Sequence, residues 1–234
     1  MNLEMLVKPN FFSNLPKITG ILFLVLIVIL LVFSTPGSTI FEMAKTQSLP
    51  TAKGMTFWIR YGILGDSFIF LTEIVIAACL FQLFRHFPSP LPAIVSFSRL
   101  GMATIQGVNL FLPLISLYLM TNAPLIEKLG DDRIRDWLDV LKQGHAYGVY
   151  LSQIFLGLSL LALGYLVVVS GVMPSLFGYL LYLASFGYFF DTFRKIFVLD
   201  NKIISAITAV LLIGSSIGEI AFAIRLIIKG IEQI

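Results

Sequence analysis

The sequence predicts an all-α polytopic membrane protein: a six-transmembrane-helix bundle with one amphipathic interfacial helix between spans three and four. Of the 234 residues, 58% are hydrophobic and only 12% are charged, whereas a soluble globular domain carries roughly 25% charged residues. The mean hydropathy is +0.94. The apolar residues also fall into long runs, and a membrane helix needs about 20 apolar residues in succession. We therefore expect a single transmembrane domain over residues 1–234, with the lipid bilayer as its surroundings.

Six apolar runs are the predicted spans, and breaks in the sequence separate them. The first run is expected to end at Pro36-Gly37 and to be retained, because "STPGST" is a poor match to a signal cleavage site. The third follows "PSPLP", and the short turn "SGVMP" makes spans four and five antiparallel neighbours. The runs show no clear inverted repeat or broken helix. The spans cover residues 18–35, 57–84, 93–120, 146–170, 172–199 and 203–229.

The connection between spans three and four, residues 121–144, has the periodicity of a helix. Its apolar residues recur at helical spacing with charges between them. Asp131 and Asp132 suit a helix start, and Gly144 suits a helix stop. The pattern predicts an amphipathic helix in the membrane interface, with Trp137 facing the bundle or the lipid. A helix packed on the loops of the bundle itself fits the pattern equally well.

The charged and reactive residues argue against several function classes. The net charge of +3 is scattered, so nucleic acid is not an expected partner. The single cysteine, Cys79, lies in an apolar run, and no Cys/His spacing typical of a metal site exists, so we expect no metal or cofactor. No serine elbow or HExxH motif is present; we expect no catalytic residues and no enzyme activity. The distribution of Lys and Arg between the two sides of the predicted bundle does not determine the membrane orientation.

Polar side chains inside the spans are the candidate functional residues. An ionised side chain at the bilayer centre costs about 2.5–3.5 kcal/mol, so these residues are expected to face the bundle interior and find partners. At a rise of 1.5 Å per residue, most of them share one layer, with Asp66 and Asn109 further along. The predicted buried polar cluster comprises Asp66, Glu73, Arg99, Gln106, Asn109 and Glu219.

Within this cluster, Glu73 and Arg99 are expected to form an ion pair. Gln106 or Glu219 is expected in the next shell around that pair. Asp191 and Arg225 lie nearer to span ends and are expected to snorkel to the interfaces.

Two functions are compatible with such a cluster. The carboxylates outnumber the deep arginine, which favours a small-solute or proton-coupled carrier, or a membrane-embedded binding protein. The alternative is a non-transporting accessory or structural subunit of a larger membrane complex, whose charges only fix helix register. A carrier of this size would be expected to form a homodimer. The small-residue motif "GSSIG" (214–218) is expected to pack helices within one chain rather than between chains.

The second half of the chain carries an ordered set of residues that resembles a known family. The set comprises "GYL" at 164–166, "SG" at 170–171 with Pro174 and Gly178, "GY" at 187–188 with Asp191, and Glu219 followed by "KG" at 229–230. It is similar to the bacterial multi-pass membrane family catalogued as domain-of-unknown-function family 4386. The resemblance implies a six-span fold in a bacterial cell membrane and supplies no activity. The segment "TIQGVNLF" (104–111) is more polar than the family pattern, which leaves the roles of Gln106 and Asn109 open.

Overall fold

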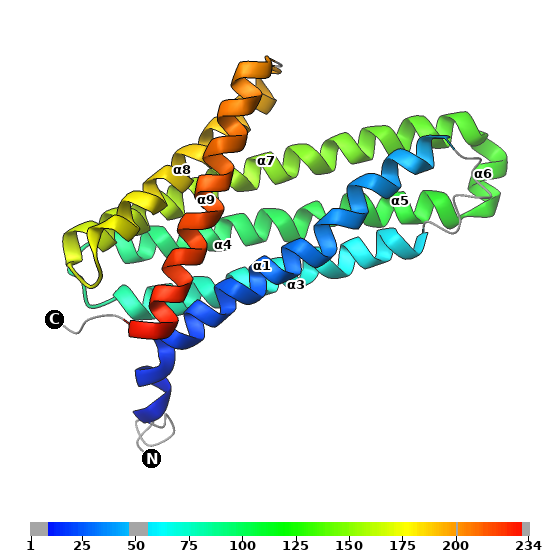
Figure 1. The fold of residues 1–234 in the computed structure, drawn as a ribbon. Coiled ribbons are helices and arrows are strands. Elements are labelled where there is room, and N and C mark those ends of the chain that lie inside the picture. Colours follow the sequence, from blue (N-terminus) through cyan, green and yellow to red (C-terminus); the bar gives the residue numbers. More distant parts are fainter. Residues whose placement is uncertain (1–8, 47–55, 200, 231–234) are drawn as a thin grey trace.

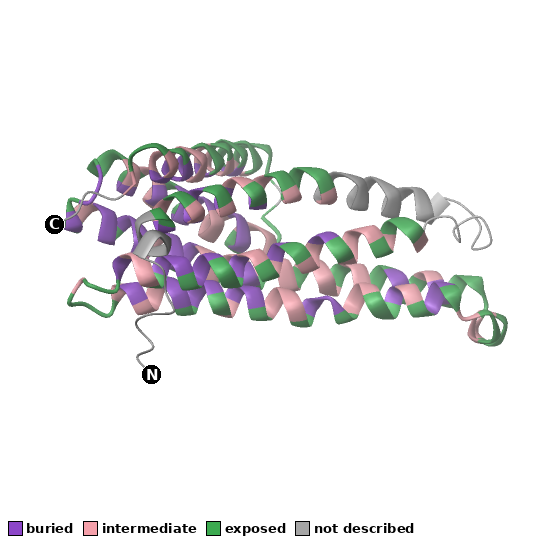
Figure 2. Ribbon diagram, turned by 90° about the horizontal axis from the view of Figure 1, so that it is seen from below, coloured by how far each residue is buried: buried purple, intermediate pink, exposed green. Residues whose placement is uncertain are grey.

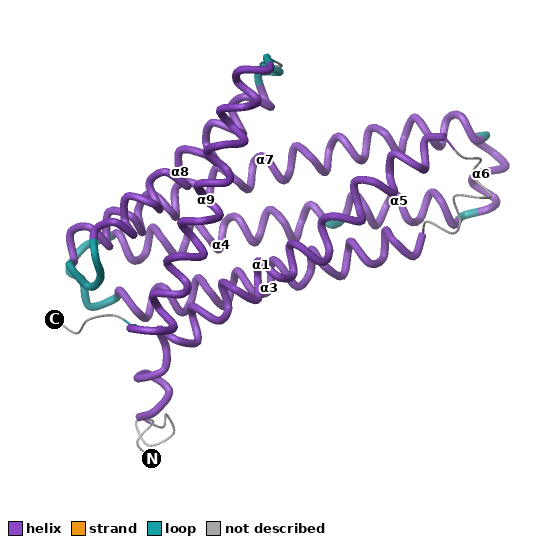
Figure 3. Tube along the Cα trace, viewed as in Figure 1, coloured by secondary structure: helices purple, strands orange, loops and turns teal. Residues whose placement is uncertain are grey.

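The computed structural model describes residues 9–46, 56–199 and 201–230, and these residues form helices and short connections with no strand (Figures 1 and 3). The all-α prediction is therefore confirmed. The helices are α1 (Pro9–Thr46), α3 (Thr56–Phe84), α4 (Leu91–Asn109), α5 (Phe111–Thr121), α6 (Ala123–Leu129), α7 (Asp131–Ser170), α8 (Ser175–Ile196) and α9 (Lys202–Lys229).

Five helical segments are long and apolar enough to cross a membrane. They are Asn14–Phe33, Thr56–Phe84, Leu91–Thr121, Asp131–Ser170 and Lys202–Lys229. Helix α8 carries three tyrosines and Asp191 and is not among the five. It nevertheless packs along α7 and α9 in the same bundle (Figure 1). These helices indicate a membrane protein, and the count of six spans stays a prediction.

The start of α1 and the end of α9 lie at the same end of the bundle (Figure 1). A Cβ atom on Gly230 would lie 3.8 Å from the ring of Pro16. Buried residues gather in the half of the bundle that holds these helix ends, while the other half is more exposed (Figure 2). The site considered below lies within this better-packed half.

One predicted helix boundary is wrong, because α1 continues through Pro36 to Thr46. A proline removes only one helical hydrogen bond, whereas ending the helix in lipid would leave several backbone groups without partners. The predicted third span agrees with the apolar segment Leu91–Thr121, although the helix is interrupted at Leu110, between α4 and α5. Pro113 has no N–H to bond the carbonyl of Asn109, and Leu110 N–H turns back to the carbonyl of Gly107 at 3.3 Å.

The amphipathic segment is helical, but it is not a separate helix ending at Gly144. Ala123–Leu129 form the short helix α6, and the residues from Asp131 on form the first turns of α7, which runs unbroken for 40 residues, or about 60 Å. That length is twice the roughly 30 Å hydrocarbon core of a bilayer. Ile134 and Leu138 pack against Leu119 and Met120 at the end of α5 and against apolar residues of α3 and α6. One face of this part of α7 therefore packs on the protein itself, as in the alternative to an interfacial helix. Trp137 lies on the opposite face and is 55% exposed.

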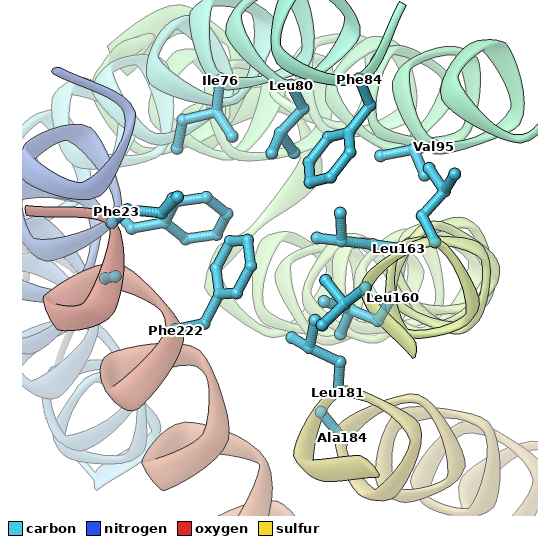
Figure 4. Packing of buried hydrophobic residues seen from close by; sticks show 14 of the residues in the cluster. Phe23, Ile76, Leu80, Phe84, Val95, Leu160, Leu163, Leu181, Ala184 and Phe222 are labelled. Carbon is cyan, nitrogen blue, oxygen red and sulfur yellow. The ribbon is translucent and has the colours of Figure 1, made fainter. Parts of the chain in front are cut away.

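The main core fills the space between α1, α3, α4, α7, α8 and α9 (Figure 4). Phe23 and Phe222 meet edge to face, with ring centroids 5.8 Å apart. Glycines let three of these helices approach closely: a Cβ on Gly164 of α7 would lie 2.8 Å from the Gly178 carbonyl of α8. A Cβ on Gly218 of α9 would lie 3.0 Å from the Leu180 carbonyl. The "GSSIG" motif thus packs α9 on α8 within the chain, as predicted.

Candidate functional site

Arg99 of α4 and Glu73 of α3 form a buried ion pair between Nη1 and Oε2. Arg99 is 0% exposed and Glu73 is 4% exposed. The two helices are antiparallel neighbours joined by a short turn, so residues at equal depth face one another. The ion pair predicted from their shared depth is confirmed.

The guanidinium group of Arg99 has a second contact on its face. Its central carbon lies 4.8 Å from the centroid of the Phe23 ring of α1. A desolvated cation–π contact of this kind is worth about 2 kcal/mol. None of the described residues accepts a hydrogen bond from Nε or Nη2 of Arg99, although both atoms are buried.

A second carboxylate lies close to this pair. Glu219 of α9 interacts electrostatically with both Arg99 and Glu73. The Tyr188 hydroxyl of α8 donates a hydrogen bond to Glu219 Oε1 at 3.1 Å, and the Ser215 hydroxyl lies 3.4 Å from the same oxygen. We call Phe23, Glu73, Arg99, Tyr188, Ser215 and Glu219 the Arg99 cluster. Its two carboxylates and one arginine come from α3, α9 and α4, and α8 and α1 contribute Tyr188 and Phe23.

Sequence reasoning missed Phe23, Tyr188 and Ser215 as parts of this cluster. Ser215 lies one helical turn before Glu219, so the spacing was readable. Tyr188 follows Gly187, whose Cβ would lie 3.2 Å from the Leu211 carbonyl of α9. That glycine brings α8 close enough to α9 for the tyrosine to reach Glu219. Nothing in the sequence singled out Phe23 among 21 phenylalanines.

Two of the remaining predicted residues, Asp66 and Asn109, form a second group with His145, which we call the Asp66 cluster. His145 Nε2 of α7 lies 3.9 Å from Asp66 Oδ2, and Asn109 Nδ2 donates a hydrogen bond to the His145 carbonyl at 2.9 Å. The side chains of Asp66 and His145 are 41% and 32% exposed. Gly148 makes room for Asn109, because a Cβ there would lie 2.3 Å from Asn109 Oδ1.

Five of the six predicted residues are therefore divided between two groups, and Gln106 belongs to neither. Gln106 lies seven residues beyond Arg99, which is about 10 Å along the helix and too far for contact. Its Oε1 atom is buried and has no hydrogen-bond donor among the described residues. His145 was missed because it lies near the boundary between the predicted amphipathic helix and span four. The described residues hold no group of three or more His, Cys, Asp or Glu that could bind a metal ion.

Of the two charges near span ends, Asp191 is held by neighbouring side chains, and Arg225 reaches toward the end of its own helix. Asp191 is 1% exposed and pairs with Lys195 Nζ at 2.9 Å and Arg194 Nη2 at 3.3 Å. The expectation that Asp191 snorkels is wrong, because basic residues one helical turn away on α8 reach back to it. Arg225 Nη1 donates to the Gly230 carbonyl at 3.0 Å at the end of α9. Both arrangements are structural rather than parts of a site.

Comparison with known proteins places these features in a family. The family model described as "Domain of unknown function (DUF4386)" matches residues 18–230. The chain belongs to this family. An uncharacterized protein of Archaeoglobus fulgidus is similar to this DUF4386 protein, with 26% identity over 170 residues that cover 73% of this chain and 84% of the relative. No solved structure matches.

The residues that resembled the family have clear structural roles in this DUF4386 protein. Gly164 and Gly178 form the close contact between α7 and α8. Gly171 ends α7 in the left-handed conformation, with φ of +67°, which glycine adopts without steric cost. Tyr188 and Glu219 hydrogen-bond across α8 and α9. The set therefore builds the α7–α8–α9 half of the bundle and one side of the Arg99 cluster.

Proposed function

We propose that this protein is a six-span protein of the cell membrane that acts as a small-solute or proton-coupled carrier, or as a membrane-embedded binding protein. The Arg99 cluster is its site. The observation that carries the proposal is the excess of acid: Arg99 already pairs with Glu73, yet Glu219 lies beside them in the same apolar core.

A purely structural network has no need of Glu219. An additional acidic side chain in a membrane interior is costly, and the ion pair is complete without it. Tyr188 and Ser215 both direct their hydroxyl groups to Oε1 of Glu219. A carboxyl that is held in this way and lies next to a guanidinium group can take up and release a proton without leaving the cluster. That property is what proton coupling requires.

The experiment that tests this proposal is an infrared pH titration of the protein in lipid nanodiscs, which follows the C=O stretching band of protonated carboxyl groups. A titrating band that disappears in Glu219→Gln supports the proposal. Asp66→Asn is the matched control, because Asp66 belongs to the other cluster, and the band that Glu219→Gln removes should persist in that variant. A spectrum that Glu219→Gln leaves unchanged would contradict the proposal.

The alternative is an accessory subunit, and the closure of the cluster favours it. A groove of about 490 Å³ between α4, α7 and α8 is lined by none of the Arg99 cluster residues. Arg99 itself is fully buried. If the charges are scaffolding, a stable Glu73→Gln/Arg99→Gln double variant should complement the cellular defect that deletion of the gene causes. If they form a site, the stable double variant should fail to complement that defect.

A further inference from the structure

One edge of the Arg99 guanidinium group is buried and has no partner. Nη1 donates to Glu73, and the ring of Phe23 covers a face of the group. Nε and Nη2 remain, and no described residue accepts from either. The N–H groups of these two atoms point in the same direction and are spaced to match the two oxygens of a carboxylate. The unpaired edge is therefore the one that arginine uses for bidentate recognition.

The surroundings do not explain the unpaired edge as a structural feature. A buried donor without an acceptor is destabilising, more so in a charged group. The nearest further acid, Glu219, is held by Tyr188 and Ser215 on one of its own oxygens. A network built only for stability would be expected to place an acceptor on this edge.

We propose that the Nε–Nη2 edge of Arg99 binds the carboxylate of an apolar monocarboxylic acid. This inference rests on the proposed function and names the ligand class of the same site. Phe23, Phe222 and Ile76 belong to the apolar core (Figure 4), and Phe23 also contacts the guanidinium group, so we expect the rest of the ligand to meet hydrocarbon. A monovalent carboxylate suits one arginine better than a phosphate, which would bring a larger negative charge beside two acids.

The charges around Arg99 connect ligand binding with Glu219. Glu73, Glu219 and Tyr188 are the titratable groups that α3, α9 and α8 contribute around the guanidinium group. With both acids ionised, the cluster already carries one net negative charge. A bound carboxylate would add a second, so its binding is favoured when Glu219 is neutral. Glu219→Gln reproduces that neutral form and should strengthen carboxylate binding.

The test is the thermal stability of the purified full-length protein in detergent micelles with two carboxylate probes. Sodium butyrate represents an acid dissolved in water, and oleate added to the micelles represents an acid from the bilayer. Sodium chloride at equal ionic strength is the control for butyrate, and methyl oleate is the control for oleate. At about 100 times its Kd, a ligand of the folded state should raise Tm by roughly 5–11 °C.

Either probe raising Tm above its control supports the carboxylate site, and the probe that acts identifies the source of the ligand. Arg99→Lys keeps the charge and loses the planar edge, so it should abolish the shift. Arg225→Lys, the same substitution at the end of α9, should retain it. If Arg99→Lys does not fold, Glu219→Gln still tests the proposal, because this variant should lower the probe concentration at which half of the maximal Tm increase is reached.

The proposal is overturned if neither carboxylate raises Tm above its control, or if Glu219→Gln leaves that concentration unchanged. It is also overturned if folded Arg99→Lys retains the shift. These outcomes are distinguishable from failure of the proposed function. A Glu219-dependent infrared band without carboxylate binding would support proton exchange at Glu219 and contradict only the proposed ligand class.

Discussion

Breaking the Glu73–Arg99 pair is the perturbation whose effect can be worked out most directly. Arg99→Gln removes the cationic partner of Glu73, a carboxyl that is only 4% exposed in the apolar core. Removing one partner of a buried pair typically costs about 3–5 kcal/mol, and loss of the cation–π contact with Phe23 adds about 2 kcal/mol. By the scaling for soluble proteins of this size, the resulting loss of roughly 5–7 kcal/mol lowers Tm by about 10–28 °C.

The double variant Glu73→Gln/Arg99→Gln should recover part of this loss. Neither charge is then stranded, and two amide side chains can hydrogen-bond to one another. We expect the double variant to be about 3 kcal/mol more stable than Arg99→Gln. The assay is a double-mutant cycle measured by thermal unfolding in detergent, because the cycle isolates the coupling between the two sites. Arg225→Gln, outside the cluster, serves as the control for loss of an arginine.

The reasoning is refuted if the effects of the two substitutions simply add. Additivity would mean that Glu73 and Arg99 do not depend on one another in the folded protein. A double variant that is less stable than Arg99→Gln would contradict the expected recovery. A small effect of Arg99→Gln alone, below about 1 kcal/mol, would show that the pair is solvated rather than buried.

Three further predictions concern other parts of the bundle. Gly148→Ala should destabilise the protein by about 1–3 kcal/mol, because the new Cβ would lie 2.3 Å from Asn109 Oδ1; Gly62→Ala, with no atom within 4 Å of its Cβ, should not lower Tm. Tyr188→Phe removes one hydrogen bond to Glu219 and should cost about 1–3 kcal/mol in the same assay, since the partly buried acceptor then loses a donor. Reporters fused before α1 and after α9 should both report the same side of the membrane, and opposite sides would contradict an even number of spans.

The all-α class and the approximate helix positions followed from the sequence because lipid leaves the backbone little choice. In hydrocarbon, N–H and C=O groups must bond within the segment, so an apolar run of sufficient length is a helix. The same regularity made the Glu73–Arg99 pair predictable. A fixed rise per residue converts sequence position into depth, and two charges at equal depth on neighbouring helices have a strong reason to meet.

Depth alone could not show how each helix is rotated or where it bends, and these features were decided by tertiary packing. Gln106 lies on the same helix as Arg99 but about 10 Å further along it, which is too far for contact. Asp66 pairs instead with His145 of α7. The continuity of α7 through Gly144 depends on its packing against α5 and α6 rather than on its own residues. Tyr188 reaches Glu219 only because glycines allow α8 to approach α9. Sequence periodicity describes each helix separately, whereas the partners of a buried charge depend on contacts between several helices at once.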